Sequence, residues 1–132
     1  AAKKKVAISM VRSPGMRHRH SAPEAEMIVV EGEPEKVVEK VQELTASCKA
    51  EGKKVGILTT NESQPYYEAD VVKPFGRKDD LATIARNLFR LLREFDEERV
   101  DVIIAEGVVT QDLGLAVMNR LRRAANFNII EA

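Results

Sequence analysis

Short apolar segments alternate with amphipathic helical segments along most of this chain, and that alternation constrains its fold more than any other feature. The apolar runs that predict strands lie at residues 27–30, 55–58, 70–73, 101–105 and 128–130. Helical patterns lie at residues 34–51, from 79 or 80 to about 95, and from 110 or 112 to 125. This order is typical of a mostly parallel sheet with helices on both faces. The sequence therefore predicts an α/β, Rossmann-like three-layer open sheet of about four or five strands.

The predicted helices carry their apolar residues on one face and have recognisable ends. Pro34 suits the first turn of the first helix, Gly52 suits its end, and Asp79 or Asp80 suits the N-cap of the second. The apolar stripe of the first helix is Val37, Val41, Leu44 and Cys48. Because Cys48 is the only cysteine, it cannot form an internal disulfide, and we interpret it as a small core residue rather than a nucleophile.

Residues 1–26 show neither helical nor strand periodicity, and we interpret them as an extended basic linker ahead of a folded domain at 27–132. Residues 1–20 hold six Lys and Arg and no acid, whereas residues 21–132 hold 15 basic and 21 acidic side chains. The net charge of zero therefore hides a basic front and an acidic body. The basic segment either meets an anion or is simply solvated.

Missing motifs disfavour several classes of function. No phosphate loop follows the first strand, neither G-x-x-x-x-G-K-S/T nor G-x-G-x-x-G, and Glu33 after Gly32 would repel a pyrophosphate. His18 and His20 lack further ligands nearby, so no metal site is expected in this chain, and no G-x-S-x-G nucleophile elbow occurs. The longest apolar run, about four residues, is far short of the roughly 20 that span a membrane, and nothing resembles a signal peptide. We therefore expect a cytoplasmic protein.

Polar and glycine residues follow the predicted strands, at the place where open α/β sheets bind ligands. These residues are Thr59, Thr60, Asn61, Glu106, Gly107 and Gly114. Hydroxyl groups together with a helix N-terminus could hold a small anion there. Alternatively, the Thr and Asn residues complete turns, and Gly114 lets a helix pack closely on the sheet.

A second candidate site is segment 13–23, Ser-Pro-Gly-Met-Arg-His-Arg-His-Ser-Ala-Pro. In an extended chain Arg17 and Arg19 point one way, and His18 and His20 point the other. Arginine binds phosphate through two hydrogen bonds, and histidine donates to an anion or relays a proton near neutral pH. The segment could therefore cover a phosphate-bearing ligand held by another domain, or it could be a solvated linker.

Segment 13–23 resembles the interdomain linker of the long-form threonylcarbamoyl-AMP synthases, typically S/A-P-G-M-K-Y-R/K-H-Y-A/S-P. Residues 88–97, L-F-R-L-L-R-E-F-D-E, are similar to L-F-x-x-L-R-x-F-D-E in the C-terminal domain of that family. Residues 114–125, G-L-A-V-M-N-R-L-R-R-A-A, resemble its G-L-G-x-A-I-M-N-R-L-x-K-A-A. The resemblance runs from about Ser13 to the end of the chain, with the motifs in the same order.

The resemblance implies a Rossmann-like accessory, regulatory domain whose partner is a separate catalytic domain. The full enzymes join threonine, bicarbonate and ATP into threonylcarbamoyl-AMP and pyrophosphate, and this intermediate serves the modification of an adenosine in tRNA. ATP and a divalent metal ion would be bound by the catalytic domain, which this chain does not contain. No cofactor and no catalysis are therefore expected of this chain alone.

The resemblance also implies that the linker lies over the catalytic cleft. The residues carried over to this covering role are Arg17, Arg19, His20, Ser21 and Pro23. Three positions depart from the family pattern, because Arg17 replaces a lysine while His18 and Ser21 replace tyrosines. Arg17 keeps the positive charge, whereas Ser21 lacks the aromatic ring for stacking.

Two other functions stay open on the residues alone. The chain could be a free-standing small-ligand or nucleotide-binding module that uses the strand ends. It could also contact RNA through Lys3, Lys4 and Lys5 together with Arg17 and Arg19. The acidic body and the lack of an RNA motif or aromatic platform argue against direct nucleic-acid binding. No membrane partner is expected.

Overall fold

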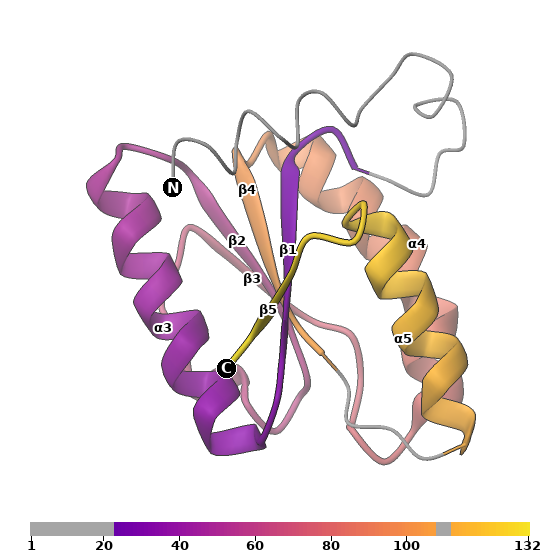
Figure 1. Cartoon of the computed structure of the whole chain (residues 1–132). Coiled ribbons are helices and arrows are strands. Elements are labelled where there is room, and N and C mark those ends of the chain that lie inside the picture. Colours follow the sequence, from indigo (N-terminus) through magenta and orange to yellow (C-terminus); the bar gives the residue numbers. More distant parts are fainter. Residues whose placement is uncertain (1–22, 108–111) are drawn as a thin grey trace.

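The computed structural model of the chain describes residues 23–107 and 112–132, with the backbone alone at 112–115. Strands and helices alternate along it (Figure 1). The strands are β1 (Glu26–Glu31), β2 (Val55–Thr59), β3 (Val71–Pro74), β4 (Val102–Glu106) and β5 (Ile129–Glu131). The helices are α3 (Pro34–Ala50), the 3₁₀ turn η1 (Gln64–Tyr66), α4 (Leu81–Glu98) and α5 (Asp112–Ala124). Each predicted strand and helix is found within about three residues of its expected position. The turn η1 was not predicted.

The strands form one parallel sheet in the order β3-β2-β4-β1-β5. At its centre Ile104 of β4 lies level with Ile28 of β1 on one side and Ile57 of β2 on the other. Parallel strands need their backbone groups paired and both faces covered, which explains why the central strands read as continuous apolar runs. The α/β open-sheet prediction is confirmed, with every described strand pair parallel.

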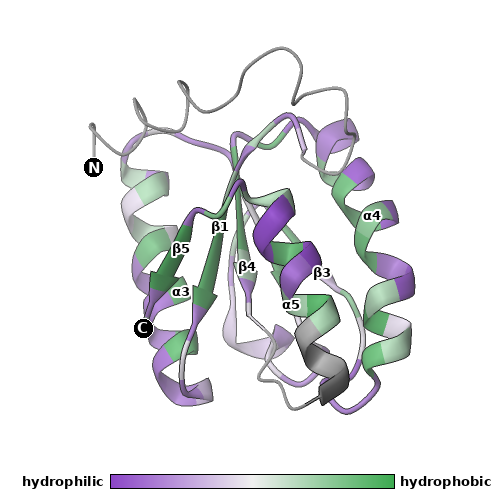
Figure 2. Cartoon of the chain, turned by 45° about the vertical axis from the view of Figure 1, so that its right-hand side comes forward, coloured by the Kyte–Doolittle hydropathy of each residue, from purple (hydrophilic) through white to green (hydrophobic). Residues whose placement is uncertain are grey.

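Alternate strand residues build two cores, one on each face of the sheet. Ile28, Val30 and Ile57 belong to the core under α3, which also includes Tyr67. Their chain neighbours face the opposite core, under α4 and α5. Figure 2 shows hydrophobic strands flanked by helices whose outer sides are hydrophilic. The fold therefore has three layers, with α3 on one face and α4 and α5 on the other (Figure 1).

The buried stripe of α3 differs from the predicted one. Val37, Val41 and Thr45 are buried, whereas Leu44 and Cys48 are half-buried at the edge of the same core. A threonine can occupy this position because its hydroxyl donates a 2.7 Å hydrogen bond to the carbonyl of Val41, one turn earlier. A spacing of four residues repeated twice therefore defines the face that meets the sheet.

The ends of α4 follow from local side-chain and backbone chemistry. Asp80 is the N-cap of α4. The Oδ1 atom of Asp80 accepts from the backbone N of Thr83 at 3.2 Å, and its Oδ2 atom accepts from the hydroxyl of Thr83 at 2.8 Å. Arg99 ends the helix in a left-handed conformation, with φ of 61°. Of the two predicted caps, Asp80 is the one used.

Residues 23–25 pack against the folded body before β1 begins. Pro23 and Ala25 are buried, and the backbone N of Glu24 donates to Oδ1 of Asp96 at 3.0 Å. This contact ties the segment to the last turns of α4. The other predicted linker residues, Arg17, Arg19, His20 and Ser21, lie outside the described residues.

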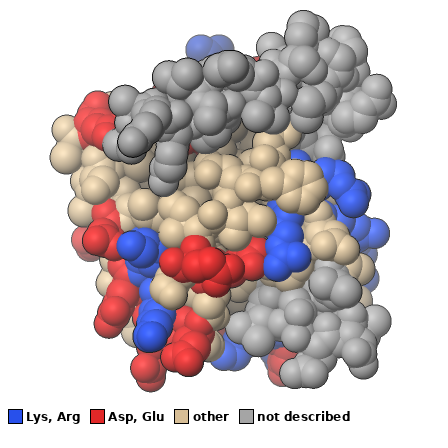
Figure 3. Space-filling view, in the orientation of Figure 1, with Lys and Arg blue, Asp and Glu red and all other residues tan. Residues whose placement is uncertain are grey.

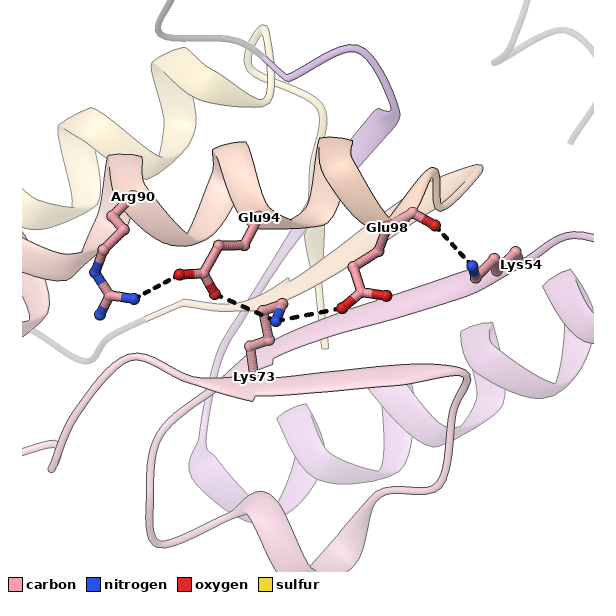
Figure 4. Close-up of polar contacts among 5 residues, drawn as sticks. All are labelled: Lys54, Lys73, Arg90, Glu94 and Glu98. Atoms are coloured by element: carbon pink, nitrogen blue, oxygen red, sulfur yellow. Dashed lines mark hydrogen bonds and ion pairs between the residues drawn. The ribbon is translucent and has the colours of Figure 1, made fainter.

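The edge strand β3 carries a cluster of ion pairs, drawn in Figure 4. Nζ of Lys73 lies 3.2 Å from Oε1 of Glu94 and 3.8 Å from Oε2 of Glu98. Arg90 pairs with the other oxygen of Glu94 at 2.7 Å, and Nζ of Lys54 donates to the carbonyl of Glu98 at 2.6 Å. A lysine followed by Pro74 on an edge strand discourages pairing with another sheet.

Candidate functional site

The strand order creates a crevice at the carboxyl end of β4. Strand β4 lies between β1 and β2. The chain leaves β1 and β2 toward the α3 face of the sheet, through α3 and through the connection that carries Tyr67. It leaves β4 toward the opposite face, through α5. Connections that part in this way leave an opening at the strand ends, which is where open α/β sheets bind ligands.

The carboxylate of Glu106, the last residue of β4, lies at the base of this crevice. Its side chain accepts hydrogen bonds from the end of β2. Its Oε1 accepts from the hydroxyl of Thr59 at 2.6 Å, from the backbone N of Thr60 at 2.9 Å and from the hydroxyl of Thr60 at 3.3 Å. Glu106 is only 5% exposed. Buried carboxylates require such donors because burial removes water from the charge.

Tyr67 supplies the fourth donor, from the connection between β2 and β3. Its hydroxyl donates to Oε2 of Glu106, and the residue is 6% exposed. Burial, and then the hydrogen bond to Glu106, raise the pKa of Tyr67 well above its usual value. The phenol therefore keeps its proton and acts as a fixed donor.

A pocket of about 420 Å³ opens above Glu106. Its walls come from the loops after β1, β2, β3 and β4, and its lining is Gly32, Pro34, Val37, Thr60, Ser63, Lys78, Asp79, Glu106 and Gly107. Gly107 is required by close packing, because a Cβ there would lie 2.9 Å from the carbonyl oxygen of Val30. Volumes of roughly 300 to 1,000 Å³ are usual for small-molecule sites.

The structure brings together four of the six predicted strand-end residues. Thr60, Glu106 and Gly107 line the pocket, and Thr59 holds the Glu106 carboxylate. Asn61 is exposed and outside the lining, with its backbone N donating to the carbonyl of Gly76 at 2.9 Å. Gly114 lies near the start of α5.

Sequence reasoning missed Tyr67 as the fourth donor, and it also missed Ser63 and Lys78 in the lining. All three lie in connections that read as polar loops. The available signal was a pair of tyrosines, Tyr66 and Tyr67, after Pro65 in an otherwise polar segment; Tyr66 is exposed and Tyr67 is buried. Such a residue in a loop often packs back on the core.

Other chemistry is limited in the described part of the chain. Residues 23–107 and 112–132 contain no group of three or more His, Cys, Asp or Glu placed to hold a metal ion. No helix there is long and apolar enough to cross a membrane. On the face drawn in Figure 3, the described acidic and basic side chains are interspersed rather than gathered into a basic field.

Comparisons with known proteins identify a family and two relatives that this chain resembles in sequence. Residues 1–126 match the family of threonylcarbamoyl-AMP synthase C-terminal domains. The chain is 51% identical over 124 residues to the threonylcarbamoyl-AMP synthase of Pyrococcus abyssi, covering 94% of this chain and 35% of that protein. It is 45% identical over 118 residues to that of Bacillus subtilis, covering 89% and 33%. The chain therefore spans about a third of the length of these relatives.

Solved structures give the same result. The crystal structure of Pyrococcus abyssi Sua5 complexed with L-threonine matches with a TM-score of 0.75 and 52% identity, over 84% of this chain and 31% of that one. The C-terminal Sua5 domain from Pyrococcus horikoshii matches with a TM-score of 0.69 and 47% identity, over 84% of this chain and all of that one. The alternating strands and helices, the motifs and these matches agree, and the chain belongs to the family of threonylcarbamoyl-AMP synthase C-terminal domains.

Proposed function

We propose that this chain is an accessory, regulatory domain of a threonylcarbamoyl-AMP synthase and that segment 13–23 covers the active site of the catalytic domain. The observation that carries the proposal is family membership combined with length, because the chain corresponds to only about a third of the length of its relatives. The remaining two thirds would hold the catalytic groups. The whole enzyme would join ATP, threonine and bicarbonate into threonylcarbamoyl-AMP and pyrophosphate for the modification of tRNA.

In this proposal the catalytic domain binds ATP and a divalent metal ion. This chain contributes positively charged side chains and a segment that covers the active site. Arg17 and Arg19 would lie over a phosphate-bearing group, because guanidinium groups bind phosphate through paired hydrogen bonds. His20 and Ser21 would complete the covering segment. They would exclude water and supply donors near the ligand.

The buried end of the segment supports this arrangement. Pro23 is buried, and the next residue is held by the 3.0 Å hydrogen bond from the Glu24 backbone to Asp96. A covering segment anchored at one end loses less conformational entropy on closing than a free one. The body of the domain would therefore act as the fixed point from which segment 13–23 reaches the catalytic domain.

The test uses the full-length enzyme and removes both guanidinium groups. The Arg17→Ala/Arg19→Ala variant should form threonylcarbamoyl-AMP about ten- to a hundredfold more slowly, because charge-assisted hydrogen bonds have about that effect. Its melting temperature should not change, since linker arginines contribute little to folding. The Lys3→Ala/Lys5→Ala variant removes the same charge outside segment 13–23 and should keep its activity.

Two results would contradict the proposal. Normal activity of the double arginine variant would reduce segment 13–23 to a tether. Turnover of ATP, threonine and bicarbonate by the purified 132-residue chain, after controls for contamination, would mean that the domain is itself catalytic.

A further inference from the structure

The geometry points to a binding site for a small aliphatic ammonium compound in the pocket above Glu106, with the charged nitrogen on the Glu106 carboxylate. This site does not depend on the role proposed for segment 13–23. The residue types alone suggested a small anion at the strand ends. A buried carboxylate at the base of the pocket favours the opposite charge.

Glu106 carries a charge that no cation matches among the described residues. Its four partners, the hydroxyls of Thr59, Thr60 and Tyr67 and the backbone N of Thr60, are all neutral. The ion pairs found in residues 23–107 and 112–132 do not include it. A buried anion held by neutral donors alone attracts any cation that can reach it.

The carboxylate also has acceptor capacity left. Two carboxylate oxygens offer about four lone-pair sites. Oε1 is shared by three donors, whereas Oε2 accepts only from Tyr67 among the described residues. The carboxylate can therefore accept a further N–H group without displacing an existing donor.

The pocket lining selects an organic cation over a bare metal ion. One carboxylate whose oxygens already accept four hydrogen bonds is a poor metal ligand, because divalent cations need several oxygen ligands at once. The volume of about 420 Å³ is also far larger than an ion requires. Pro34 and Val37 provide an apolar wall against which an aliphatic chain can pack.

The exposed charges around the mouth of the pocket are of both signs. Lys78 and Asp79 line it; the Asp79 carboxylate is paired with the Arg77 guanidinium at 2.7 Å, and Oε1 of Glu62 accepts from the backbone N of Lys78 at 3.0 Å. Glu33 precedes α3 and makes no side-chain cap hydrogen bond. These exposed charges of both signs are screened by solvent, so the buried Glu106 carboxylate sets the charge preference of the pocket.

The experiment is an NMR titration of the ¹⁵N-labelled 132-residue chain with three compounds of equal chain length: butylamine, butanol and butyrate. The amides of Thr60, Ser63 and Gly107 report on the pocket. Butylamine should shift these amides with a Kd at least about tenfold lower than that of butanol, because a charge-assisted bond adds to the apolar contact. Butyrate should produce no shifts.

Variants identify the carboxylate as the cause. Glu106→Gln keeps the shape and removes the charge, so butylamine should then bind no better than butanol. Glu33→Gln removes a nearby exposed charge outside the lining and should change the Kd for butylamine by less than about twofold, because exposed charges are screened. Ser63→Leu fills the pocket without touching Glu106 and should abolish all binding even if Glu106→Gln does not fold.

Three outcomes would overturn the inference. One is the absence of shifts at Thr60, Ser63 and Gly107 up to roughly 100 mM butylamine, well beyond a millimolar Kd. Another is binding of butanol or butyrate as tight as that of butylamine. The third is undiminished butylamine binding by a folded Glu106→Gln or Ser63→Leu variant.

Discussion

Two polar clusters of this domain use carboxylates in opposite ways. At the edge strand β3, Glu94 and Glu98 lie at the surface beside Lys73, with Arg90 and Lys54 next to them (Figure 4). At the end of the central strand β4, Glu106 is buried and is bound by neutral hydroxyl and amide groups from three residues.

The difference shows that position in the sheet decides what a carboxylate can do. When a surface ion pair forms, each charged group exchanges contacts with water for a contact with the opposite charge, so the pair contributes little to stability. A buried carboxylate must be fully provided with donors, so its removal disturbs several elements at once. Among the described residues, no cation is paired with the Glu106 carboxylate.

The largest effect in this comparison is expected from Glu106→Ala. The substitution leaves the hydroxyl of Tyr67 and the backbone N of Thr60 without their acceptor in a buried site. We expect the free energy of unfolding to fall by about 2–4 kcal/mol, as for the loss of several hydrogen bonds to a charged group. Urea denaturation followed by circular dichroism measures it. A fall no greater than that of Glu94→Ala would contradict the distinction between the two clusters.

A smaller effect is expected from Tyr67→Phe, which removes one donor and leaves three. We expect a loss of about 1–2 kcal/mol at neutral pH. Tyr66→Phe is the matched control, because Tyr66 is the adjacent residue and is 61% exposed. Its free energy of unfolding should stay within about 0.5 kcal/mol of the parent. Equal losses in the two variants would show that the Glu106 contact contributes nothing.

The same pair of variants tests the pKa of Tyr67. Because that pKa is raised above the ordinary value of 10.0, the folded state holds the phenol proton longer than the unfolded state does. The stability from this group is present below pH 10 and is lost as the pH rises further. Unfolding measured from pH 8 to 11 should therefore show a steeper decline for the parent and Tyr66→Phe than for Tyr67→Phe. Parallel curves would count against a buried phenol.

The smallest effect is expected from Glu94→Gln in the surface cluster. The hydrogen bond from Arg90, and then that from Lys73, hold the pKa of Glu94 below its usual 4.5. Its contribution is therefore present above about pH 4.5 and is lost as the pH falls. At pH 7 and low salt the variant should melt slightly below the parent, by less than Tyr67→Phe, and the difference should vanish in roughly 1 M salt. A difference that persists in salt would show that this cluster is not simply a screened surface network.

The residue pattern alone determined the elements of this protein. The apolar runs predicted each strand that the structure describes, and Asp80 was among the predicted helix caps, because periodicity and capping act within a few residues of the chain. The motifs at 88–97 and 114–125 identified the family, which the comparisons confirmed. The rule that ligands bind at the carboxyl ends of strands pointed to Thr59, Thr60, Glu106 and Gly107, which the structure brings together at one pocket.

Tertiary structure alone decided how those pieces meet. The order β3-β2-β4-β1-β5 places β4 between β1 and β2, and it thereby brings Glu106 to Thr59, 47 residues away, and to Tyr67, 39 residues away. No local pattern encodes such pairings. They follow from which strand order buries the apolar faces on both sides of the sheet while leaving each buried polar group with a partner, and that condition involves the whole chain at once.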